Sequence, residues 1–98
     1  MIVPPIAAYL YGAAIVADEA VDAGHDPTPA ILTAATLLER HEADHGPMPP
    51  GPGRVALLDA QAALVGAWAR HDPTLIPDAE RVEAARDLAI ATMPRGDA

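Results

Sequence analysis

The chain has 98 residues, of which 51% are hydrophobic, and its formal net charge at pH 7 is −8. That length suits one domain, and the hydrophobic fraction favours a packed core over disorder. The six basic residues are all arginine, and an acidic chain without clustered positive charge is not suited to binding phosphates, which argues against nucleic-acid binding. Cysteine and serine are both absent, which removes disulfides, thiolate chemistry and the commonest hydrolase nucleophiles.

The composition also limits how large the core can be. Only Tyr9, Tyr11 and Trp68 are aromatic, so the core must consist of alanine, valine, isoleucine and leucine. Such small side chains fill little volume per residue, and a monomer would have a thin core, so we expect a homo-oligomer. The apolar N-terminal stretch lacks a basic region, and its helical part at residues 6–17 is too short to span a bilayer. We therefore expect a soluble, cytoplasmic protein that does not bind membranes.

The first helix is expected at residues 5–23, because Gly24 suits the left-handed position that ends a helix. Its first three turns are apolar on every side, which is typical of a helix that is central or lies at an interface. Ala8, Gly12 and Val16 form a slim ridge along this helix, which would allow another helix to approach closely.

The end of the first helix carries three acidic residues, Asp18, Glu19 and Asp22. Negative charge at this end opposes the helix dipole and is destabilising unless a cation lies nearby. We expect Arg70, at the neighbouring corner of the fold, to supply that compensating charge.

The tetrapeptide His-Asp-Pro-Thr occurs twice, at residues 25–28 and 71–74. Aspartate is a good helix N-cap, and proline fits the first turn of a helix but cannot continue the preceding one. Each copy therefore predicts a sharp corner between two helices, with Asp26 and Asp72 as caps. Both corners are expected to be structural rather than functional.

The second helix, expected at residues 29–44, leads into the sequence His41-Glu42-Ala43-Asp44-His45. This sequence matches H-E-x-x-H and resembles the motif of the zinc metallopeptidases, in which two histidines one helical turn apart bind Zn²⁺. The resemblance implies His41 and His45 as metal ligands and Glu42 as the general base that activates the metal-bound water.

A zinc site also needs a third ligand, and the remaining histidines are badly placed to provide it. His25 and His71 belong to the two corners, roughly 20 Å away along the helix axis. The alternative interpretation is that His41 and His45 simply end the helix, where a positive charge interacts favourably with the helix dipole. We favour this alternative and expect no catalytic residue, metal or cofactor.

The second half of the chain is expected to form another helical hairpin. The helix at residues 54–70 has few polar positions and should be largely buried. In the helix at residues 77–92, we expect one stripe to face the core and the charged positions to face water. The core-facing stripe consists of Val82, Ala85, Leu88, Ala89 and Met93, and the water-facing positions are Glu80, Arg81, Glu83, Arg86 and Asp87.

These elements predict a single all-α domain, namely two helical hairpins that form a small four-helix bundle within one chain or after dimerisation. The first hairpin is expected at residues 5–45, a Pro/Gly-rich linker at 46–53, the second hairpin at 54–93 and a frayed tail at 94–98.

The predicted function is non-enzymatic: a small interaction or regulatory protein that binds a protein partner through an apolar helix surface. An accessory factor of a virus or mobile element is one kind of protein that fits. The alternatives are a zinc-dependent hydrolase using Glu42 and a structural or assembly subunit. The expected partner-binding residues are Ile6, Tyr9, Leu10, Gly12, Ala13, Val16 and Trp68.

Overall fold

The computed structural model describes residues 4–93. It contains four α-helices, α1 (Pro5–Asp22), α2 (Thr28–His45), α3 (Pro52–His71) and α4 (Ile76–Ala91), and a short 3₁₀ helix η1 (Pro73–Leu75) before α4. No strand occurs in this part of the chain, so the predicted all-α four-helix bundle is confirmed. The tail predicted at residues 94–98 lies outside the described residues.

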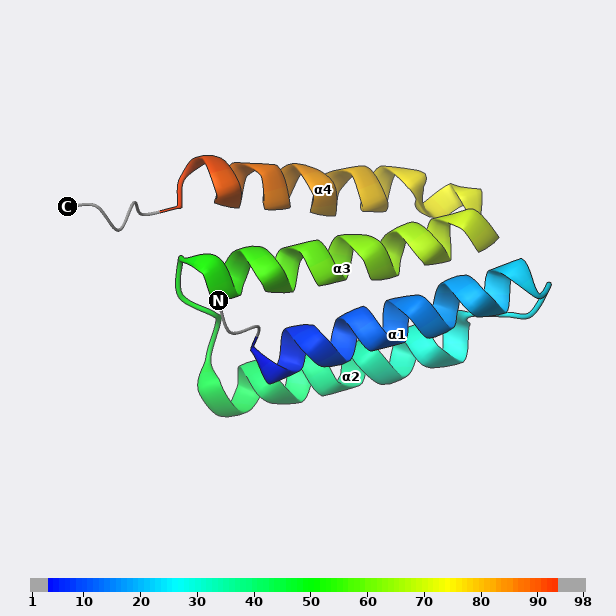
Figure 1. The fold of residues 1–98 in the computed structure, drawn as a ribbon, viewed down its shortest axis with the longest axis horizontal. Helices are drawn as coiled ribbons and strands as arrows, with labels where there is room; N and C mark the ends of the chain where they lie inside the picture. The colour runs from blue at the N-terminus through cyan, green and yellow to red at the C-terminus, as the bar shows by residue number, and fades with distance from the viewer. Residues whose placement is uncertain (1–3, 94–98) are drawn as a thin grey trace.

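The two hairpins are arranged so that α3 lies between α1 and α4, while α2 packs along α1 (Figure 1). Because α2 returns the chain to the start of α1, the short linker lets α3 run parallel to α1. Within residues 4–93, α4 packs against α3 and η1 but not against α1 or α2. The bundle measures 49 by 26 by 22 Å. Within the described residues α1 packs against α2 and α3 but not against α4, so one face of α1 has no neighbouring helix.

The core lies around α3, where α1 and α2 meet it. It is built from small side chains: seven of the twelve residues in the buried cluster are alanine. Leu10 on α1 is the largest side chain of this cluster to be fully buried. On α3, only Arg54, Ala63, Arg70 and the terminal residues Pro52 and His71 are exposed, which confirms that this helix is largely buried.

The helix ends follow the turn chemistry of the sequence. Gly24 has a φ of +78°, so the left-handed residue after α1 is confirmed. The expected linker was too long, because Pro52 and Gly53 form the first turn of α3. Proline is well suited to that position, since the first backbone N–H groups of a helix have no partner within the helix.

The aspartates of both corners accept hydrogen bonds from the following turn, but neither is the N-cap residue of α2 or α4. Asp26 Oδ1 accepts from the Thr28 backbone N–H at 2.9 Å, and Asp72 Oδ1 accepts from the Thr74 backbone N–H at 3.1 Å. Asp72 thereby caps η1 rather than α4, and the N-cap residue of α2 is Pro27 rather than Asp26. The hydroxyl and the backbone N–H of Thr28 lower the pKa of Asp26, and those of Thr74 lower the pKa of Asp72.

The two corners meet at the same end of the bundle because α1 and α3 are parallel. Arg70 donates hydrogen bonds to Asp18 and Asp22 of α1, so the predicted compensation of charge at the end of α1 is confirmed. In the second contact, His71 Nε2 lies 3.5 Å from Asp26 Oδ1. These contacts tie the two hairpins together at their corners, in agreement with a structural role.

The face that α4 turns toward α3 differs from the prediction. Ala79 is buried and Arg86 is partly buried, whereas Ala85 is exposed and Leu88 is 65% exposed. The reason is a polar contact: Arg86 Nη1 lies 3.3 Å from Asp59 Oδ1 on α3. An arginine can cover a neighbouring helix with its aliphatic stem while its guanidinium reaches a carboxylate, so α4 is rotated relative to the expected stripe.

Candidate functional site

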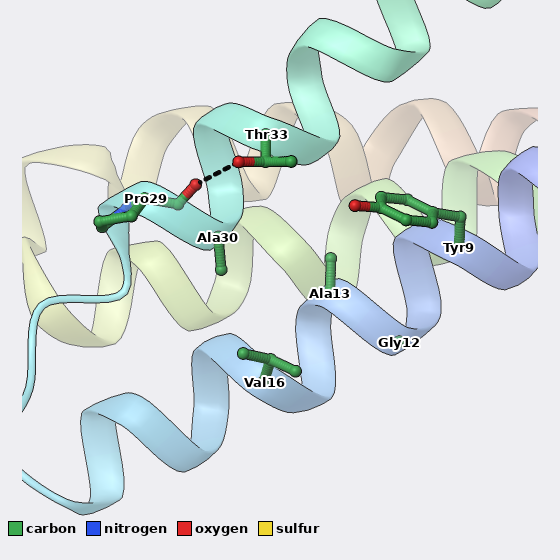
Figure 2. Close-up of a pocket in the computed structure, with 7 residues that line it drawn as sticks. All are labelled: Tyr9, Gly12, Ala13, Val16, Pro29, Ala30 and Thr33. Carbon is green, nitrogen blue, oxygen red and sulfur yellow. Dashed lines mark hydrogen bonds between the residues drawn. The ribbon is translucent and has the colours of Figure 1, made fainter.

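The largest of the described hollows is an open groove of about 560 Å³ between α1 and α2. Figure 2 shows its walls, which come from both helices of the first hairpin. They consist of Tyr9, Gly12, Ala13 and Val16 from α1, and of Pro29, Ala30 and Thr33 from α2. We call these seven residues the α1–α2 groove.

The groove continues onto the face of α1 that has no neighbouring helix. Tyr9 is 45% exposed, Val16 54% and Ile15 60%. A Cβ atom added at Gly12 would meet no heavy atom within 4 Å, so the middle of this face is open. The α1 face is therefore apolar and exposed, which in proteins is a feature of interaction surfaces.

The α2 wall of the groove adds little polarity. The Thr33 hydroxyl donates to the carbonyl of Pro29 at 2.9 Å (Figure 2). A threonine that bonds within its own helix has no hydroxyl proton left to donate to a ligand. The groove walls thus present mainly apolar contact surface.

Fewer residues are available for partner binding in the structure than the sequence predicted. Ile6 and Leu10 are buried among the core residues, so they pack within the chain and are removed from the candidate surface. Trp68 is partly buried against the same core. The reason is geometric: α1 is apolar on all sides, and one of those sides must face α3.

The remaining α1 residues, Tyr9, Gly12, Ala13 and Val16, line the α1–α2 groove. Sequence reasoning missed the α2 wall. Its residues Pro29 and Thr33 are four residues apart, which places them on one helix face, and Ala30 lies beside them. That spacing was the available signal, but a proline and a threonine do not resemble an apolar stripe.

A second, smaller hollow of about 300 Å³ lies where α1, α3 and α4 approach one another. It contains a chain of polar contacts in which the Tyr11 hydroxyl donates to Asp59 Oδ2 at 2.7 Å and Arg86 pairs with the other oxygen of Asp59. Partial burial, followed by the bond to Asp59, raises the pKa of Tyr11 to about 12. The three groups satisfy one another, which gives the contact a structural role.

His41 and His45 lie side by side near the end of α2, with ring centroids 4.8 Å apart. Glu42 is exposed on the same turn. Within residues 4–93, no group of three histidine or acidic side chains is arranged to hold a metal ion. Catalytic zinc sites take three protein ligands, so this pair, which we call the α2 histidine pair, is one ligand short.

No protein-family model matches this chain, and neither the search of curated proteins nor that of solved structures finds a similar protein. Among residues 4–93, no helix is both long enough and apolar enough to cross a membrane.

Proposed function

We propose that this protein is a non-enzymatic interaction protein that binds a protein partner through the α1–α2 groove and the adjoining exposed face of α1. The observation that carries the proposal is the continuous apolar surface over the two helices, which leaves Val16 and Ile15 more than half exposed. Exposing large apolar side chains side by side is unfavourable in water, and a partner that covers them removes that cost.

Another copy of the same chain is one partner that could cover this surface. The core is built mainly from alanine, so each chain buries little large apolar surface by itself. Association of two exposed α1 faces would extend that core. From the sequence, we also propose that the protein acts in the cytoplasm.

The proposal is tested by a substitution in the middle of the exposed face. Gly12→Glu places a charge there without a clash inside the chain, since nothing lies within 4 Å of the new Cβ atom. We expect the variant to keep its helical circular dichroism while its association is lost, as measured by light scattering over a concentration series. Gly12→Ala is the matched control, because it adds one methyl group, favours the helix and leaves the face apolar.

A wild-type mass that stays at the 10.1 kDa of one chain up to millimolar concentration would remove self-association from the proposal. Association that is equally strong in wild type and Gly12→Glu would show that the α1 face is not the surface used.

A further inference from the structure

We propose that two copies associate through their α1 faces in an antiparallel, two-fold arrangement, in which Glu19 of each copy pairs with Arg40 of the other. This inference rests on the proposed function and adds to it the identity of the partner and the orientation in which it binds. It is carried by the distribution of charge around the α1–α2 groove.

Arg40 is the only lysine or arginine in the first hairpin, residues 5–45. It is exposed and lies on the same face of α2 as the groove residues Pro29 and Thr33, at helical spacings of eleven and seven residues. Among residues 4–93 it takes part in no ion pair. A cation therefore stands at one end of the groove without a carboxylate to neutralise it.

Glu19 stands in the corresponding place at the other end. Its acidic neighbours are already paired, since Asp18 and Asp22 bind Arg70. Glu19 lies on the exposed face of α1, seven residues after Gly12, and makes no ion pair within the described part of the chain. The face thus has an unpaired anion at one end and an unpaired cation at the other.

The two charges lie toward opposite ends of the groove, which Gly12 lines from α1 and Thr33 lines from α2. Glu19 is seven residues from Gly12 and Arg40 is seven residues from Thr33, which is about 10 Å in each case. Because α1 and α2 are antiparallel, the two displacements point in opposite directions (Figure 1).

A two-fold axis that lies in the plane of the interface, perpendicular to α1 at the middle of the face, exchanges the two ends of the face. With the α1 helices stacked antiparallel and crossing at Gly12, Glu19 of each copy comes beside Arg40 of the other. The same operation makes both ion pairs at once, as an isologous interface requires. No parallel stacking of the α1 helices does this, since it would bring Glu19 near Glu19.

The area of the face is sufficient for a weakly associating dimer. Helices α1 and α2 have 18 residues each, so a two-helix face is about 27 Å long and 20 Å wide. Two such faces would bury about 1,000 Å² in total, at the lower limit for specific interfaces. We expect a dimer that dissociates in the micromolar range rather than an obligate one.

The experiment is a charge exchange, with dimer dissociation constants measured by sedimentation at low ionic strength. Glu19→Arg alone and Arg40→Glu alone each place like charges opposite one another twice, and should weaken the dimer at least about tenfold. The double variant restores both pairs with reversed sign and should lie within about threefold of wild type. Glu39→Arg is the control, because it changes the net charge by the same amount as Glu19→Arg but on another side of α2. It should leave association unchanged.

The outcomes separate the arrangement from the proposed function. A wild-type dimer whose double variant is no tighter than the single variants would overturn the antiparallel arrangement while leaving self-association intact. The same conclusion follows if Glu39→Arg weakens the dimer as much as Glu19→Arg. A wild-type protein that is monomeric throughout overturns both the arrangement and the self-association on which it rests.

Discussion

Replacing Leu10 by alanine probes the core on which the exposed α1 face depends. Leu10 is 1% exposed, and most of the buried side chains that form the cluster with it are alanines. Alanine has no rotamers through which it could move into the space left by the leucine, so the cavity should remain largely open. Leucine-to-alanine changes in such sites cost about 3–5 kcal/mol, the upper part of the known range.

That cost is large for a chain of this length, whose total unfolding free energy is expected to be about 5–15 kcal/mol. The assay is urea unfolding followed by circular dichroism at fixed protein concentration. Leu88→Ala is the matched control, since Leu88 is 65% exposed and the same change there should cost less than about 0.5 kcal/mol. Equal losses from the two substitutions would refute the assignment of Leu10 to the core and of Leu88 to the surface.

In a Tyr9→Phe background, the absorbance of tyrosinate should report Tyr11 alone, with a midpoint near pH 12 that falls toward 10 in Asp59→Asn. Since the pKa of Tyr11 is higher in the folded state, its contribution to stability is complete below pH 10 and is lost between pH 10 and about 12, which alkaline unfolding should show. The pKa values of Asp26 and Asp72 are lowered in the folded state, so their contribution to stability is present above pH 3.8 and is lost below it. Replacing both by Asn should therefore make the unfolding free energy less dependent on pH in the acid range. Stability at neutral pH should stay nearly unchanged, because Asn keeps an oxygen that accepts the same hydrogen bond. Removing metal with EDTA should not shift the melting temperature, because the α2 histidine pair has only two ligands, and a marked drop would instead favour a zinc site.

The corners of this fold could be predicted because they depend on local chemistry. The two His-Asp-Pro-Thr copies and Gly24 set the helix ends through capping and backbone conformation, which a sequence states directly. The pairing of Arg70 with the end of α1 could be predicted for a similar reason, since an uncompensated acidic helix end needs a cation nearby.

The orientation of the helices could not be predicted in the same way. An amphipathic helix shows which side faces the core, but α1 is apolar on all sides, so nothing in its pattern separates buried Leu10 from exposed Val16. In α4, Arg86 carries the contact to α3 although its charge predicts a place in water. Both features depend on tertiary contacts with α3, which the local pattern does not contain.

Association through the α1–α2 groove and the adjoining exposed face of α1 can be followed residue by residue, by nuclear magnetic resonance of the labelled protein during dilution. Backbone amide signals that move with concentration identify the residues that enter or leave a contact. We expect the signals of Gly12, Val16 and Thr33 to shift, while those of Leu88 and Ile90, which are also apolar and exposed but lie on α4, stay in place. Shifts concentrated on α4, or no dependence on concentration at all, would show that the chain does not associate through this surface.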